Sequence, residues 1–125
     1  MGMSMTAGPH DPSQVADGLD EMDFRQLAAF NAGHVGVFWS EAGGPSPWEM
    51  HPDTEEMLHI LEGEIEVEIL PQDGGPGTKT RVPSGCFIVL PRGCWHRQTM
   101  LGRTKELYLT PGSTRMSRAA DPRLG

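Results

Sequence analysis

The 125-residue chain has little of what marks several large classes of protein. It has only two cysteines, too few for a disulfide framework, so both thiols are expected to be reduced. It has no apolar run long enough to cross a bilayer and no basic segment followed by an apolar one at its start. We therefore expect a cytoplasmic protein without a membrane partner. The net charge is −7 and Lys and Arg form no cluster, which argues against a nucleic-acid partner.

Hydrophobic residues are also scarce, at 37% of the chain, whereas glycine (16) and proline (11) are abundant. A chain of this length supports one domain. The many turn-forming residues favour short strands over long helices. Residues 23–30 are compatible with either a short helix or an edge strand.

Strand-like runs separated by turn signals follow one another from about residue 24. The clearest is EIEVEIL at 64–70, which places its isoleucines and valine on one face and its glutamates on the other. Further expected strands are 34–39, 48–52, 56–61, 78–82, 86–91, 95–100 and 105–110. Several short, evenly spaced strands predict an all-β sandwich or barrel.

The two ends of the chain differ from this middle part. Residues 1–22 hold few large apolar side chains and are expected to form a flexible N-terminal arm. Residues 23–112 form the predicted barrel. Residues 113–125 lose apolar content again and are expected to form a C-terminal tail that wraps the surface or frays.

The alternation of a strand also places several polar side chains on shared faces. Residues two apart point the same way, so Glu49 aligns with His51 and His96 aligns with Gln98. A turn then brings the chain back to a strand that starts near Glu56. Histidine and carboxylate side chains that converge inside a barrel suit a first-row divalent ion.

The segment Glu49-x-His51-x4-Glu56-x6-Gly63 resembles the first motif of the cupin family. In that motif two histidines one residue apart precede a glutamate and then a glycine. The departure is Glu49, which stands where cupins usually have the first histidine.

The segment Gly85-x5-Pro91-x-Gly93-x2-His96 resembles the second cupin motif, which supplies the last histidine. Every fixed position matches except the closing asparagine, where Met100 stands. The resemblance implies a double-stranded β-helix, that is, a small jelly-roll cupin barrel. The glycines of such motifs stand where a turn needs positive φ or a close backbone approach.

The resemblance further implies one divalent metal ion held by His51, Glu56 and His96, and Mn, Fe, Ni and Zn all suit such ligands. Glu49 is either a fourth ligand or a general base or hydrogen-bond partner beside the metal. Its inward direction on the strand favours ligation.

The remaining polar candidates are placed by the same rules. Gln98 and Tyr108 are expected to reach the cavity near His96, where with Glu49 they are the candidate catalytic residues. His59 lies an odd number of residues after the glutamate ligand, so it is expected to face the opposite side or a dimer contact.

By family analogy the chain is expected to be a metal-dependent enzyme of the dioxygenase, decarboxylase or isomerase type, and a homodimer. If both Glu49 and Glu56 bind the divalent ion, no net positive charge is left, so a neutral or singly charged small molecule is the expected substrate. The alternatives are a non-catalytic small-molecule or sugar-binding module, and a storage or structural role in which the metal stabilises the fold.

Overall fold

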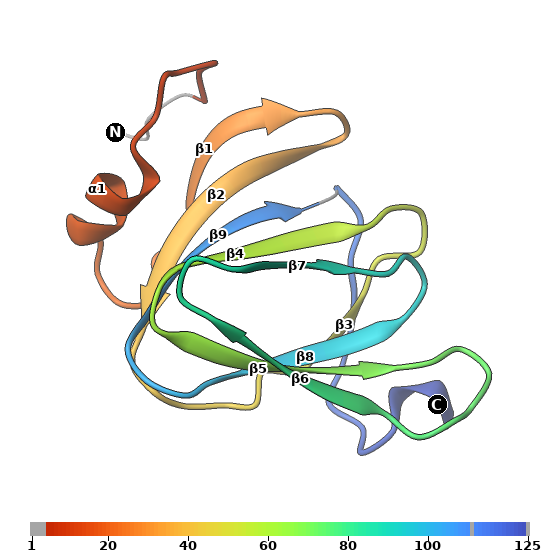
Figure 1. Ribbon diagram of the computed structural model, residues 1–125. Coiled ribbons are helices and arrows are strands. Elements are labelled where there is room, and N and C mark those ends of the chain that lie inside the picture. The colour runs from red at the N-terminus through yellow and green to blue at the C-terminus, as the bar shows by residue number, and fades with distance from the viewer. Residues whose placement is uncertain (1–4, 111, 125) are drawn as a thin grey trace.

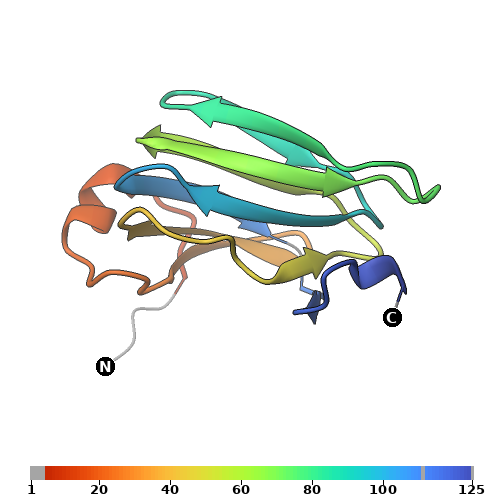
Figure 2. The same ribbon diagram turned by 90° about the horizontal axis from the view of Figure 1, so that it is seen from below.

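The computed structural model describes residues 5–110 and 112–124, so residues 1–4 of the expected arm, residue 111 of the barrel and residue 125 of the tail lie outside the described residues. Within these ranges the strands form two sheets that face each other (Figures 1 and 2). The strands are β1 (Arg25–Phe30), β2 (Gly33–Ser40), β3 (Trp48–Met50), β4 (Glu56–Glu62), β5 (Glu64–Leu70), β6 (Thr78–Pro83), β7 (Phe87–Leu90), β8 (Trp95–Met100), β9 (Thr104–Thr110) and β10 (Arg115–Ser117).

One sheet has the order β1-β2-β9-β4-β7 and the other the order β10-β3-β8-β5-β6, with antiparallel neighbours throughout. From β2 to β10 the chain changes sheets at every step except from β5 to β6. The winding is that of the expected all-β jelly roll, and the fold prediction is confirmed. The segment at 23–30 takes the edge-strand alternative, as β1.

The core lies between the two sheets. Strand β5 shows why: Ile65 and Val67 are fully buried, whereas Glu68 on the other face pairs with Arg97 at 2.9 Å. The residues of this core are Phe38, Leu58, Ile60, Ile65, Val67, Val82, Leu90, Met100 and Tyr108. The period-two pattern of the sequence therefore marks the buried face of this strand correctly.

The tight turn between β4 and β5 explains the glycine of the first motif. Gly63 has φ +92°, and a Cβ there would lie 2.5 Å from the carbonyl oxygen of Arg103. Only glycine avoids both the strained dihedral and the clash. Gly93 in the second motif has φ +76°, so both glycines fill the role expected of them.

The segment before β1 contains a helix, α1 (Pro12–Asp17), where we expected a flexible arm. The Asp11 carboxylate caps it by accepting a hydrogen bond from the Gln14 amide at 3.1 Å, and proline is favoured in the first turn. Ala16 is fully buried and packs with Val37 of β2. The helix thus covers part of the outer face of the first sheet.

The tail lies against the other sheet. Strand β10 pairs with β3, and a short 3₁₀ helix (Pro122–Leu124) follows. Of the two alternatives for the tail, the described residues therefore follow the surface. Cys86 and Cys94 are both free thiols, as expected. Among the described residues no helix is both long and apolar enough to span a membrane.

Candidate metal centre

Three side chains expected to bind metal converge at one buried point. His51 directly follows β3, Glu56 opens β4, and His96 lies on β8, whose pairing with β3 aligns it with Glu49. The Nε2 atoms of the two histidines lie 3.1 Å (His51) and 3.3 Å (His96) from the same Oε1 of Glu56. One ligand atom from each of the three residues lies within 4.8 Å of the other two.

The histidines hold Glu56 as an anion. Burial by itself would raise the pKa of this carboxyl, but the hydrogen bonds and charges of His51 and His96 together outweigh burial and lower it to about 2. Burial likewise would lower the pKa of His51, but its hydrogen bond to Glu56 leads a set of contacts that raise it. The centre is therefore a carboxylate between two imidazoles, all of them buried.

The C-terminal tail orients the ring of His51. Its Nδ1 lies 3.3 Å from the carbonyl oxygen of Ser113 and 3.0 Å from Oγ1 of Thr114. Because a carbonyl can only accept, Nδ1 carries the hydrogen in that bond and Nε2 is the nitrogen turned to Glu56. Histidines that ligate metals are commonly held in this way through their other ring nitrogen. The donor set and its orientation therefore fit a divalent ion.

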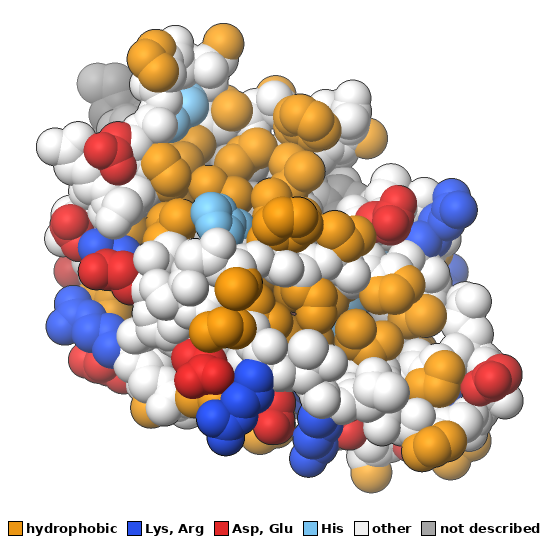
Figure 3. All heavy atoms as spheres, in the orientation of Figure 1, with side chains coloured by type: hydrophobic (Ala, Val, Ile, Leu, Met, Phe, Trp, Pro, Cys, Tyr) orange, Lys and Arg blue, Asp and Glu red, His pale blue; other side chains and the backbone are white. Residues whose placement is uncertain are grey.

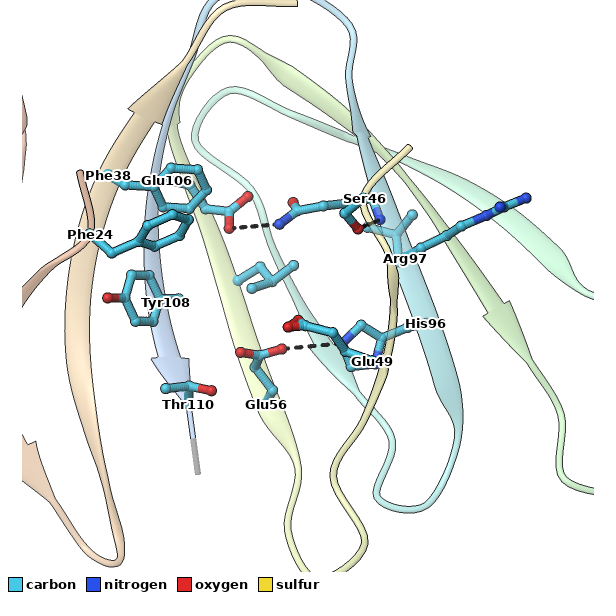
Figure 4. Close-up of a pocket in the computed structure, with 13 residues that line it drawn as sticks. Phe24, Phe38, Ser46, Glu49, Glu56, His96, Arg97, Glu106, Tyr108 and Thr110 are labelled. Atoms are coloured by element: carbon cyan, nitrogen blue, oxygen red, sulfur yellow. Dashed lines mark hydrogen bonds and ion pairs between the residues drawn. The ribbon is translucent and has the colours of Figure 1, made fainter. Parts of the chain in front are cut away.

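Glu49 lines the cavity beside this cluster but is not one of its three converging residues. Figure 4 shows its carboxylate directed into the cavity near Glu56. Burial, followed by the negative charge of Glu56, raises its pKa. Glu49 therefore holds a proton more readily than an exposed glutamate does.

The cluster opens into a cavity of about 180 Å³ between the two sheets. Its apolar wall includes Phe24 and Phe38, whose rings stack with centroids 4.1 Å apart. A neighbouring cavity of about 410 Å³ shares this pair and adds Met22, Met100 and Met116. The cluster thus lies at one end of a space with both aromatic and polar walls, an arrangement typical of small-molecule sites.

Gln98 and Tyr108 both line the cavity, as expected. The hydroxyl of Tyr108 points away from the carboxylates of Glu49 and Glu56 (Figure 4). Its ring lies directly over Gly36, where any side chain would clash with it. Burial, and then nearby carboxylates, raise the pKa of Tyr108 to about 12, so the phenol stays protonated. In this structure Tyr108 contributes its ring to the wall.

Sequence reasoning missed Glu106, which lies on β9 and is 1% exposed. Its Oε2 accepts a hydrogen bond from Nε2 of Gln98 at 3.2 Å. Burial leads the causes that raise its pKa to about 8. The sequence did contain an indication that Glu106 faces the cavity. Alternation along β9 puts Glu106 on the same face as Tyr108, which was expected in the cavity.

Two further side chains point away from the cluster, as was expected of His59. Arg97 pairs with Glu68 and lies 4.2 Å from the ring centre of Trp48, and Figure 4 shows its guanidinium directed away from the cavity. His59 lies between Phe87 and Leu107 in the register of the first sheet, on the face opposite Glu56 and Leu58.

Comparison with known proteins agrees with this architecture. The family model of the cupin domain matches residues 37–109, and the chain therefore belongs to the cupin family. This confirms the resemblance of the two motifs. No curated protein matches the chain by sequence.

Several solved structures share the fold. A cupin-2 domain-containing protein from Shewanella frigidimarina has 19% identity and a TM-score of 0.64, over 79% of this chain and 89% of that one. Hydroquinone 1,2-dioxygenase from Sphingomonas sp. TTNP3, with 4-hydroxybenzoate bound, has 15% identity and a TM-score of 0.61, over 86% and 81%. Drosophila melanogaster CENP-C bound to CAL1 has 14% identity and a TM-score of 0.55, over 60% and 63%. At these identities the likeness extends to the fold alone.

Proposed function

We propose that this cupin is a mononuclear divalent-metal enzyme that acts on a small organic molecule. The observation that carries the proposal is the buried convergence of two Nε2 atoms on one Glu56 oxygen, beside a cavity with further polar groups. A purely structural ion would be expected in a closed shell rather than at the end of a cavity.

In this proposal His51, Glu56 and His96 hold the ion, which is Mn, Fe, Ni or Zn. An ion held there would polarise an oxygen of the bound molecule as a Lewis acid, and dioxygenase, decarboxylase or isomerase chemistry is compatible with such a site. Glu49 is either the fourth ligand or the group that takes up and returns a proton. The position of Glu49 beside the cluster suits a ligand, and its raised pKa suits a group that exchanges a proton.

The substrate is neutral or singly charged. If Glu49 is the fourth ligand, Glu49 and Glu56 balance the two charges of the ion. Arg97, which borders the cavity, directs its charge to Glu68. No excess positive charge then attracts a multiply charged anion. The dioxygenase with bound 4-hydroxybenzoate is a cupin-like neighbour that holds a ligand of this kind.

The alternative is a non-catalytic module that binds a small molecule or sugar. The stacked Phe24–Phe38 pair offers a flat apolar wall that would serve binding without any chemistry. CENP-C bound to CAL1 is a structural neighbour whose association is with a protein.

We also propose that the protein is a cytoplasmic homodimer. Two rows of side chains cross the outer face of the first sheet, one through Phe87, His59 and Leu107 and one through Val89 and Met57. Phe87 is 65% exposed and Val89 is 44% exposed. Figure 3 shows hydrophobic side chains gathered over the upper part of the molecule around a histidine. Phe87→Glu should lower the sedimentation-equilibrium mass to that of a monomer, whereas an unchanged mass would exclude this face.

Elemental analysis of the purified protein tests the metal site. We expect one equivalent of Mn, Fe, Ni or Zn, lost in His51→Ala and in His96→Ala and retained in the control His59→Ala. Glu49→Gln should weaken metal binding if Glu49 is a ligand, and should spare metal while lowering activity if it is a base. Full metal content in His96→Ala would refute the site, and a metal-free parent after reconstitution would favour the binding module.

A further inference from the structure

A second polar site lies in the same cavity, away from the cluster of His51, Glu56 and His96. Glu106 comes from β9 of one sheet and Gln98 from β8 of the other, and the hydrogen bond between them spans the interior. Figure 4 shows Glu106 beside Phe38, at the end of the cavity opposite Glu49 and Glu56. The pair is therefore separate from the three converging ligand residues.

This pair leaves two buried polar atoms without a partner. Within the described residues, Oε1 of Glu106 and Oε1 of Gln98 both lack any hydrogen bond. An unsatisfied buried polar atom destabilises the fold. Glu106 is 1% exposed and lines the cavity, so its free Oε1 is a group positioned for a ligand.

The hydrogen bonding of the pair defines what it can bind. The raised pKa keeps Glu106 protonated at neutral pH. Since its Oε2 accepts from Gln98, the proton belongs on Oε1, which is then a free donor. Oε1 of Gln98 is a free acceptor. A hydroxyl group can satisfy both atoms, because it accepts one hydrogen bond and donates another. A carboxylate cannot donate to Gln98, and an ammonium cannot accept from Glu106.

The space between the two polar ends suits a single ring. A cavity of about 150 Å³ is enough to bind benzene, and this one has about 180 Å³. The aromatic walls are the stacked rings of Phe24 and Phe38 and the ring of Tyr108, whose centroid lies 5.9 Å from that of Phe24. A planar, apolar ligand body would pack against these rings.

We infer that Glu106 and Gln98 form a hydroxyl-binding subsite, which recognises the far end of a hydroxylated, ring-sized molecule whose other end lies at the metal cluster. The inference rests on the proposed small-molecule function and names its substrate class. Sites that hydrogen-bond a ligand hydroxyl discriminate strongly against the analogue that lacks it. The subsite would therefore decide specificity without taking part in metal binding.

Calorimetric titration of the full chain, with its metal content measured in parallel, tests the subsite. The probes are 4-hydroxybenzoate and benzoate, which differ only in the hydroxyl. We expect the parent to bind 4-hydroxybenzoate at least about tenfold more tightly. Glu106→Leu and Gln98→Leu should reduce that ratio to about two or less, with benzoate affinity unchanged. Glu106→Gln keeps an N–H donor and should retain part of the preference. Thr110→Val, which changes another residue lining the cavity, is the control and should retain all of it.

The outcomes separate the two proposals. If the parent binds 4-hydroxybenzoate no better than benzoate, or binds neither, the subsite is refuted even when the metal analysis succeeds. An equal preference in the parent and Glu106→Leu also refutes it. A preference that depends on Glu106, in a protein that takes up no metal, would support the subsite and refute the metal-enzyme proposal.

Discussion

Two glutamates buried in the same cavity have opposite proton affinities. The pKa of Glu56 falls to about 2, whereas that of Glu106 rises to about 8. Burial raises both, so burial does not make the difference. Glu56 receives two imidazole Nε2 atoms on one oxygen, whereas Glu106 receives a single neutral amide hydrogen bond. The number and charge of the donors thus divide the cavity into an anionic end and a neutral end.

The two ends of the cavity therefore suit different tasks. A permanent carboxylate beside two imidazoles is a cation site. A neutral carboxyl is a hydrogen-bond donor, and it is useful only where the surroundings keep it protonated. The experiments below change one end while leaving the other intact, in order of decreasing expected effect.

The largest effect is expected on metal affinity. Glu56→Gln removes the only anion among the three converging residues, so the dissociation constant for Zn²⁺ should rise by more than about 100-fold, beyond the range typical of residues outside the ligand shell. Glu106→Gln should change it by less than about threefold. Competition with a chromogenic chelator measures both constants. Equal losses in the two variants would mean that the two ends are not independent.

The next effect is on stability as a function of pH, measured in metal-free protein. In the folded state Glu106 keeps its proton up to about pH 8, whereas the unfolded chain releases it near 4.5. The native state therefore binds more protons between these values, and stability falls as the pH rises through them. The negative charges of Glu56 and Glu49 in the same cavity raise the pKa of Glu106 further, against the hydrogen bond from Gln98, which lowers it. The basic groups that border the cavity are His96, which contacts Glu56, and Arg97, which pairs with Glu68.

Glu106→Gln removes this penalty. Relative to the parent, the variant should gain a few kcal/mol between pH 5 and pH 9, or roughly 10 °C in Tm. Thermal unfolding followed by circular dichroism at several pH values gives the comparison. Parallel Tm profiles for the two proteins would show that Glu106 is ionised in the native state at neutral pH.

The smallest effect tests the support of the anionic end. Thr114→Val removes one of two contacts to Nδ1 of His51, and the carbonyl of Ser113 remains. Zn²⁺ affinity should fall by about tenfold or less, at the low end of what such supporting residues contribute. Thr110→Val, which borders the cavity without a contact to His51, is the matched control. An equal change of Zn²⁺ affinity in both variants would show that the contact between the tail and His51 does not support metal binding.

Two of the expected strands match the structure at both ends. β5 and β8 begin and end at the expected residues, 64–70 and 95–100. Helix α1 was missed because it buries a single residue, Ala16, and so has no visible apolar period. Its cap, Asp11 followed by Pro12, was the available signal.

Strand β9 shows the limit of patterning. Leu107 and Leu109 alternate with Glu106 and Tyr108, and the buried face is the one with Thr104, Glu106 and Tyr108. An alternating pattern shows which residues share a face of the strand, but it does not show which of the two faces is buried. The register with β4 decides it, because Glu106 lies opposite the buried Ile60.

Strand alternation was enough to predict an all-β domain, and the resemblance of two motifs to those of cupins added the jelly-roll fold, the family and the three residues His51, Glu56 and His96 that converge. The contact of the tail with His51 and the hydrogen bond between Glu106 and Gln98 across the interior were not predictable in this way. These contacts join residues far apart in the chain and on different sheets, and no local pattern encodes which of them face one another.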